Sequence, residues 1–169
     1  MGVSPPSLNQ AKLLATKQLS TLILYITAKI KDVFKLGRKY PWPRPEICPR
    51  CKARGVWGHG YVLAYFDGFN EGLLLKRYLC PGCGCVIRLR PEGYLRRFQA
   101  SIDTIRFCLS HRLRYGRWPP GVSRSRQGHW LRSLRRKVFA YLGQGFKGGP
   151  LAGFDHLLFR GINPVSRSI

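Results

Sequence analysis

The sequence predicts an α+β fold in which a small β-sheet, built around two cysteine pairs, is flanked by helical segments. Three observations support this class. Two CPxC pairs, Cys48 with Cys51 and Cys80 with Cys83, bracket a stretch rich in aromatic and β-branched residues. That stretch has the composition of strands. The segments before and after it repeat apolar residues every three or four positions, which is the period of a helix.

The two cysteine pairs predict a metal site. Each C-P-x-C turn brings two sulfurs within reach of one ion, and four thiolates fill the tetrahedral shell of Zn²⁺ without leaving a position for water. We therefore expect Cys48, Cys51, Cys80 and Cys83 to hold one structural zinc ion. The alternatives are a redox CxxC and a disulfide pair, but neither a βαβ pattern nor a secretory signal accompanies the cysteines.

The residues that follow each pair fit tight turns. Gly84 can adopt the left-handed conformation that such turns often need, whereas Lys52 holds the matching place in the first turn and fits it less well. Cys85 and Cys108 are expected to be spare thiols that pack as small apolar side chains. His59 is expected to be a strand residue facing solvent or phosphate, and the glycines on either side of it indicate a close backbone approach or a bulge.

The segment between and after the pairs predicts a zinc ribbon over residues 48–92. Residues 56–66 and 73–79 read as a β-hairpin with the turn DGFNEG between them. Residues 86–90 alternate apolar with basic side chains, which predicts a third, half-exposed strand. Such a small sheet cannot be held by burial alone, so metal binding is expected to supply much of its folding free energy.

Residues 1–37 are expected to form an amphipathic helix, because apolar side chains recur at helical spacing through residues 8–36. Two interpretations of this helix remain open: a packing or homodimerisation element, and a basic segment lying on a membrane surface. Its apolar run is too short to span a bilayer. Residues 38–47 contain three prolines and are expected to be a linker.

Residues 93–142 predict a basic helical pair. The first helix covers residues 101–114 with Ser101 as its cap, and the second, capped by Ser123 or Ser125, ends near Leu142. The pair is helix-turn-helix-like, although its connection of about eight to ten residues exceeds the usual three or four. Nonspecific contact with phosphates is the alternative. Residues 143–169 are expected to be a glycine-rich, poorly ordered tail with at most a short turn at residues 154–159.

The charge balance predicts a polyanionic partner. The 169 residues include 30 Lys and Arg against 7 Asp and Glu, a net charge of +23. Counterion release favours the binding of a protein with such an excess of positive charge to nucleic acid, and arginine suits bidentate contacts with phosphate or guanine. The residues expected to contact nucleic acid are Arg88, Arg90, Arg96, Arg97, Arg124, Arg126, Arg132, Arg135, Arg136 and Lys137.

The few carboxylates argue against catalysis. They are too dispersed to predict a paired acid and base or a two-metal centre. The sequence also lacks a glycine-rich phosphate loop, a GxSxG elbow and an HExxH motif. We therefore expect that the chain is not an enzyme.

Three segments, PRPEICPRCKARGVWGHG, RYLCPGCG and VSRSRQGHWLRSLRR, resemble a bacterial zinc-ribbon family of unassigned function. They are also similar to the zinc ribbons of insertion-sequence transposases. The resemblance covers residues 43–142 and implies a DNA-binding protein associated with a mobile element, serving a transposase or recombinase encoded elsewhere. The chain departs from the pattern at Cys85 and Val86, where a polar or basic residue and Thr are common, and residues 1–40 lie outside the match.

These expectations combine into one functional hypothesis. The chain is expected to be a noncatalytic, zinc-dependent accessory or regulatory protein that binds duplex DNA in the bacterial cytoplasm, associated with the nucleoid. An RNA-binding or ribosome-associated structural protein and a protein-binding adaptor are the alternatives.

Overall fold

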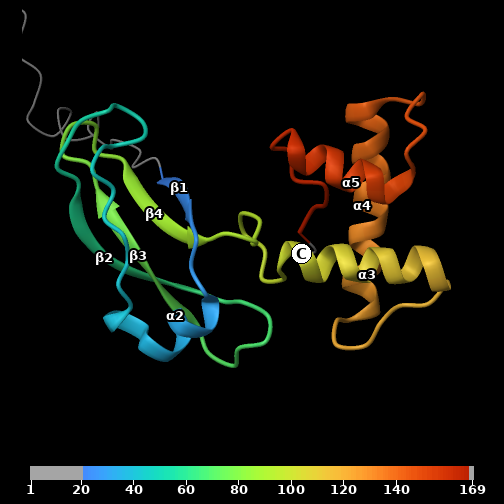
Figure 1. The fold of residues 1–169 in the computed structure, drawn as a ribbon, viewed down its shortest axis with the longest axis horizontal. Coiled ribbons are helices and arrows are strands. Elements are labelled where there is room, and N and C mark those ends of the chain that lie inside the picture. The colour runs from blue at the N-terminus through green and yellow to red at the C-terminus, as the bar shows by residue number, and fades with distance from the viewer. Residues whose placement is uncertain (1–20, 168–169) are drawn as a thin grey trace, which may run out of the picture. The chain divides into compact units, whose positions relative to one another are not determined.

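The computed structural model describes residues 21–167, which fold as two compact units (Figure 1). The first unit contains residues 21–64 and 73–91, and the second contains residues 65–72 and 92–167. The first is built on a β-sheet and the second on helices. The predicted α+β class is therefore confirmed.

The first unit is a four-stranded sheet with the order β1-β4-β3-β2. Strand β2 (Trp57–Ala64) pairs antiparallel with β3 (Leu73–Leu79), and β3 pairs antiparallel with β4 (Val86–Pro91). The predicted hairpin and returning strand are confirmed. A register shift between Gly58 and Tyr61 provides the bulge expected beside His59.

Strand β4 is a central strand. Its second neighbour is β1 (Thr21–Ile26), which runs parallel to it with Leu24 opposite Leu89. Because both edges of β4 are paired, five of its six residues are buried. The expectation of a half-exposed third strand is therefore wrong, since the sequence of β4 does not show that another strand will cover its free edge.

The helix predicted over residues 8–36 is wrong where the structure describes its first part. Thr21–Ile26 is a strand, and its alternate residues Leu22, Leu24 and Ile26 pack against the sheet core. These apolar positions satisfy a period of two as well as the helical period, so pairing with β4 decides the outcome. The helix on which the expected homodimer interface rested is thus not formed at β1, and residues 8–20 lie outside the described residues.

A short helix, α2 (Ile30–Leu36), remains from the predicted one. It ends at Gly37, which has φ 52°. Val33 is fully buried, while Phe34 and Leu36 are exposed. Within residues 21–167, none of the helices has the length and apolar character needed to cross a bilayer.

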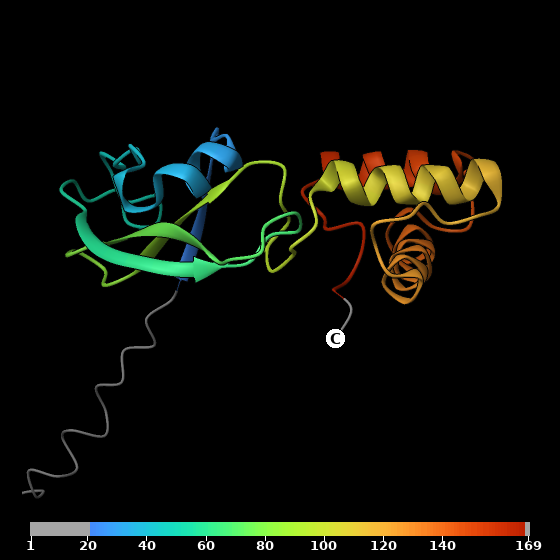
Figure 2. The ribbon, with the colours of Figure 1, turned by 90° about the horizontal axis from the view of Figure 1, so that it is seen from below.

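The second unit contains the predicted helical pair, α3 (Ile102–Tyr115) and α4 (Arg124–Leu142). Ser101 caps α3 by accepting a hydrogen bond from the Thr104 amide at 3.0 Å, and Ser123 caps α4. Figure 2 shows α4 nearly end-on while α3 runs across the view, so the two helices cross steeply. Residues 116–123 connect them.

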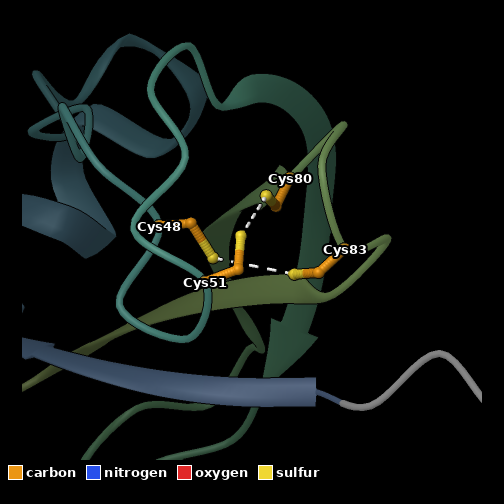
Figure 3. A group of neighbouring side chains, drawn as sticks. All are labelled: Cys48, Cys51, Cys80 and Cys83. Carbon is orange, nitrogen blue, oxygen red and sulfur yellow. Dashed lines mark hydrogen bonds between the residues drawn. The ribbon is translucent and has the colours of Figure 1, made fainter.

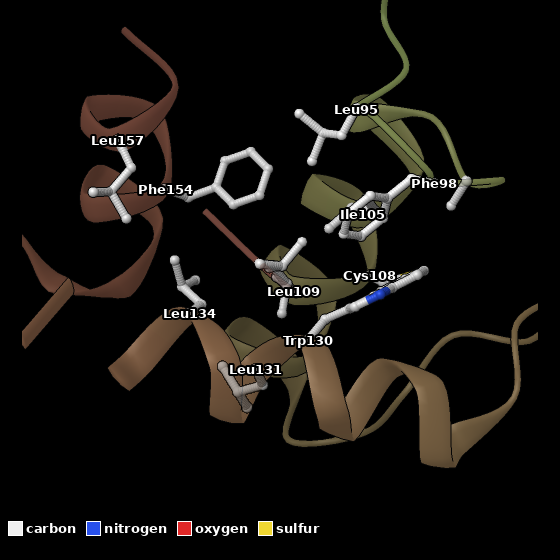
Figure 4. Packing of buried hydrophobic residues seen from close by; sticks show 12 residues of the cluster. Leu95, Phe98, Ile105, Cys108, Leu109, Trp130, Leu131, Leu134, Phe154 and Leu157 are labelled. Atoms are coloured by element: carbon white, nitrogen blue, oxygen red, sulfur yellow. The ribbon is translucent and has the colours of Figure 1, made fainter. Parts of the chain in front are cut away.

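A third helix, α5 (Gly149–Phe159), completes this unit, so the expectation of a poorly ordered tail is wrong. Phe154 and Leu157 are fully buried against Leu109 of α3 and Leu134 of α4 (Figure 4). One of the glycines that suggested disorder, Gly153, serves packing instead. At Gly153, a Cβ would lie only 2.4 Å from Cγ2 of Val138.

Candidate metal centre

The two cysteine turns repeat one backbone pattern. In the first, the Cys48 amide donates to the Ala53 carbonyl at 2.8 Å and the Lys52 amide donates to the Cys48 carbonyl at 2.9 Å. In the second, the Cys80 amide donates to the Cys85 carbonyl at 3.0 Å and the Gly84 amide donates to the Cys80 carbonyl at 2.9 Å. We call these two turns the knuckles. Each therefore presents its two sulfurs on an equivalent backbone frame.

The left-handed position predicted for each knuckle is observed. Gly84 has φ 68° and Lys52 has φ 62°. This conformation suits glycine and is strained for lysine, because a Cβ approaches the neighbouring carbonyl. The first knuckle contains this strain. A strained backbone conformation persists only where the surrounding structure holds it in place.

The two knuckles face each other and bring four sulfurs together (Figure 3). All four Sγ atoms lie within 4.8 Å of one another. The distance from Cys51 Sγ to Cys80 Sγ is 3.5 Å, and the distance from Cys48 Sγ to Cys83 Sγ is 3.8 Å. A tetrahedron with metal–sulfur bonds of about 2.3 Å has sulfur–sulfur edges of about 3.8 Å. The four sulfurs therefore have the spacing of a metal shell.

Glycine at position 82 permits this approach of the knuckles. A Cβ at Gly82 would lie 3.0 Å from Ala53 Cβ and 3.6 Å from Cys51 Sγ. Any side chain here would therefore push against the opposite knuckle, beside one of the four sulfurs. The sequence gives no sign of this contact, because it joins residues from different turns.

Backbone amides favour the thiolate form of Cys48 and Cys83. Burial raises the pKa of the Cys48 thiol, but hydrogen bonds from the amides of Cys51 and Arg50 outweigh it, and the pKa falls to about 6. The amide of Cys85 likewise lowers the pKa of Cys83. Since metals bind the thiolate, these donors prepare the two cysteines for a cation. At Cys51 the hydrogen bond from the Ala53 amide is outweighed by contacts with Cys80 and by burial, and the pKa rises to about 11.

Cys85 lies beside the cluster but behaves differently. Its Sγ is 3.7 Å from Cys48 Sγ, and its side chain is buried in the sheet core. Burial, followed by contacts with Cys48 and Cys83, raises its pKa to about 12. This direction favours the neutral thiol, as expected for a packed apolar side chain. Cys108 is also buried, within the helical core.

The cluster could hold a metal ion, and its chemistry favours a closed site. Four cysteine sulfurs fill a tetrahedral shell, so no position remains for a reacting water molecule. Cys48 and Cys80 are fully buried, and only Cys51 is exposed. His59 lies in β2 and is not among the clustered residues of the described chain.

The structure separates the ten predicted nucleic-acid contacts into three groups. Three are buried or have a partner within the protein. Arg90 is only 5% exposed, so its burial removes it from the surface on which the prediction placed it. Arg126 forms an ion pair with Asp67 at 2.9 Å. Lys137 donates through Nζ to the carbonyl of Asn163 at 2.6 Å.

Six of the ten are exposed, and Arg88 is partly buried. The exposed six are Arg96, Arg97, Arg124, Arg132, Arg135 and Arg136. Arg132, Arg135 and Arg136 lie on one outward face of α4, because positions three and four apart are neighbours on a helix. None of these three forms an ion pair with another described residue.

Two further arginines were missed by the sequence analysis. Arg77 of β3 lies directly opposite Arg88 of β4. Burial lowers the pKa of Arg88, and the positive charge of Arg77 lowers it further. Strand register brings them together, and a single sequence does not reveal register. Arg167 was overlooked because it lies in the segment expected to be poorly ordered.

Comparison with known proteins yields no relative. No protein-family model, no curated protein and no solved structure matches the chain. The resemblance to zinc ribbons of mobile elements therefore stays a prediction.

Proposed function

We propose that the chain is a noncatalytic, zinc-dependent DNA-binding protein. In this proposal Cys48, Cys51, Cys80 and Cys83 hold one structural Zn²⁺ in a zinc ribbon, and the exposed arginines of α4 contact DNA phosphates. The observation that carries the DNA proposal is the outward face formed by Arg132, Arg135 and Arg136, which form no ion pair with any residue of the described range 21–167.

Zinc is the metal favoured by the donor set. Tetrahedral coordination by four thiolates is typical of structural zinc and of iron. A bound zinc ion would crosslink the two knuckles. Metal content of protein purified without added metal tests this assignment: we expect one zinc per chain, and one iron per chain would contradict it.

The shape of α4 suits a phosphate backbone. Its 19 residues give a helix of about 28 Å. Duplex DNA carries one charge per about 1.7 Å of axis, so a helix of this length meets several phosphates. The connection of α3 and α4 is longer than a helix-turn-helix turn, which favours backbone contact over base readout.

The test is a salt series of duplex DNA binding with two triple variants. Removing three phosphate contacts by R132A, R135A and R136A should lower the magnitude of the salt slope by about 2.7. K31A, K35A and R38A form the control, because these exposed residues carry the same total charge on the other unit. Equal loss in both variants would show diffuse attraction only, and unchanged slopes would remove the α4 face from the proposal.

Competition defines the alternatives. Structured RNA that outcompetes duplex DNA at equal salt would favour an RNA-binding or ribosome-associated role. Salt-insensitive capture of a protein, with no nucleic acid bound, would favour an adaptor. A transposase or recombinase as partner rests on the sequence resemblance alone, and co-purification with such an enzyme would test it.

A further inference from the structure

The helical unit contains a cavity of about 280 Å³. Its lining residues are Arg97, Phe98, Gln99, Arg126, Trp130 and Arg167. Half of them are arginines, and none is acidic. Cavities for drug-sized ligands begin near 300 Å³, so this one suits a smaller group. Its lining therefore indicates a small anion.

Arg97 is held in a strained conformation at this cavity. The Phe98 amide donates to the Leu95 carbonyl at 3.1 Å, which closes a four-residue turn with Arg97 in third place. Arg97 has φ 67°, a value that a turn of this kind normally assigns to glycine. Leu95 and Phe98 are both buried in the helical core, so they fix the turn. Strain of this type is concentrated at functional sites.

Arg126 is held rigidly in the cavity wall. Its guanidinium lies 5.0 Å from the centre of the Trp130 ring and pairs with Asp67. Stacking and pairing fix the planar fork before any ligand arrives, which lowers the entropy cost of binding. Arg126 also lies in the first turn of α4, where the helix dipole favours an anion.

Arg167 reaches the same cavity from an anchored segment. The Ser166 amide donates to Ser133 Oγ at 2.8 Å, and Val165 is buried. Within the described residues, neither Arg97 nor Arg167 forms an ion pair or hydrogen bond through its guanidinium. Two cationic groups at this cavity thus have no counterion from the protein.

We propose that this cavity binds one phosphate group of a nucleic acid, held by Arg97, Arg126 and Arg167. Guanidinium forks match the oxygens of a phosphate in paired hydrogen bonds. The nucleic-acid source rests on the proposed function, whereas the phosphate chemistry follows from the cavity itself. Both a terminal phosphate and an internal phosphodiester offer that chemistry.

The test compares Arg97→Gly with Arg96→Ala. Arg96 is exposed in the same turn and carries the same charge, but it does not line the cavity. Each full-length protein is titrated calorimetrically with inorganic phosphate, with a duplex bearing 5′-phosphates, and with the same duplex bearing 5′-hydroxyls. We expect R97G to lose about tenfold or more in phosphate affinity. R96A should stay within about twofold of the wild type on phosphate, since it removes no cavity contact.

Thermal unfolding separates loss of the site from loss of the fold. R97G relieves the left-handed strain, so its melting temperature should equal or exceed that of the wild type. Preference of the wild type for the 5′-phosphorylated duplex would assign the cavity to a terminal phosphate. Equal affinity for both duplexes, weakened in R97G, would assign it to a phosphodiester.

Two results would overturn the proposal: phosphate binding by R97G that equals that of the wild type, or an equal loss in R96A. Absence of phosphate binding by the wild type would overturn it as well. If R97G binds both DNA and phosphate as the wild type does, the cavity proposal fails and the proposed function stands. If the protein binds no DNA but R97G weakens its phosphate binding, the cavity proposal stands and the proposed function fails.

Discussion

The carbonyl oxygens of Ala53 and Cys85 accept equivalent hydrogen bonds, from the amides of Cys48 and Cys80 at 2.8 and 3.0 Å. The two residues thus close equivalent knuckles, and only Cys85 carries a sulfur. Because alanine serves this position in the first knuckle, the structural role does not require a thiol. We therefore expect Cys85 to lie beside the cluster without being a metal ligand.

This equivalence predicts different outcomes for two neighbouring cysteines. Cys85→Ala should retain one metal ion per chain, because the four clustered sulfurs remain. Cys83→Ala should lose the metal to a competing chelator at far lower chelator concentration, because the shell is left incomplete. Metal content after dialysis against increasing chelator measures both. Equal loss in the two variants would place Cys85 in the shell.

Gly82 provides a test of how closely the knuckles must approach. Gly82→Ala should destabilise the metal-bound protein by about 1–3 kcal/mol, because the new Cβ would press on Ala53 Cβ. The double variant with Ala53→Gly removes the opposing methyl group and should recover most of that loss. Chelator competition and thermal unfolding report the effect. A G82A protein with wild-type metal affinity and stability would show that the knuckles need not meet here.

Packing of α5 on α4 predicts a large effect at Gly153. Gly153→Ala should destabilise the helical unit by about 1–3 kcal/mol, because the added Cβ clashes with Val138. Gly145→Ala is the matched control, since a Cβ there meets nothing within 4 Å. Urea unfolding followed by circular dichroism measures both variants. A neutral G153A would mean that α5 does not pack as described.

The ion pair between Arg106 of α3 and Asp155 of α5 predicts a pH dependence. The two groups meet at 2.8 Å, and the hydrogen bond from Arg106 lowers the pKa of Asp155. A carboxylate with a lowered folded pKa stabilises the protein above its unfolded pKa of about 3.9. That contribution is lost as the pH falls through the lower folded pKa.

Asp155→Asn should therefore cost stability at neutral pH and nothing at strongly acidic pH. Both side chains are about half exposed, so the expected loss is only about 0.2–1 kcal/mol. The measurement is the difference in unfolding free energy between wild type and variant across the acid range. A difference that does not shrink toward low pH would assign the effect to packing instead of charge.

Local signals in the sequence sufficed for much of the fold. The C-P-x-C turns predicted the cysteine cluster, Ser101 predicted the start of α3, and the choice between Ser123 and Ser125 included the observed cap of α4. These features depend on residues close together in the chain. A capping side chain bonds to an amide in the first turn of its helix, and a knuckle closes over six residues. Such information is present in one sequence.

The predictions were wrong where contacts with distant segments of the chain determine the conformation or burial of a residue. The apolar residues of β1 fit either period, and only the free edge of β4 selects the strand. Arg90 looked exposed by alternation, yet β1 covers that strand. Phe154 and Leu157 lie among glycines that suggested disorder, although Gly153 allows close packing on α4. Composition does not record these long-range contacts.

X-ray absorption at the metal edge tests the central claim most directly, because it counts the atoms around the ion. On protein purified without added metal, the account predicts one zinc ion surrounded by four sulfurs at about 2.3 Å. Nitrogen or oxygen neighbours in place of a sulfur, or a well-folded protein that carries no stoichiometric metal, would contradict it.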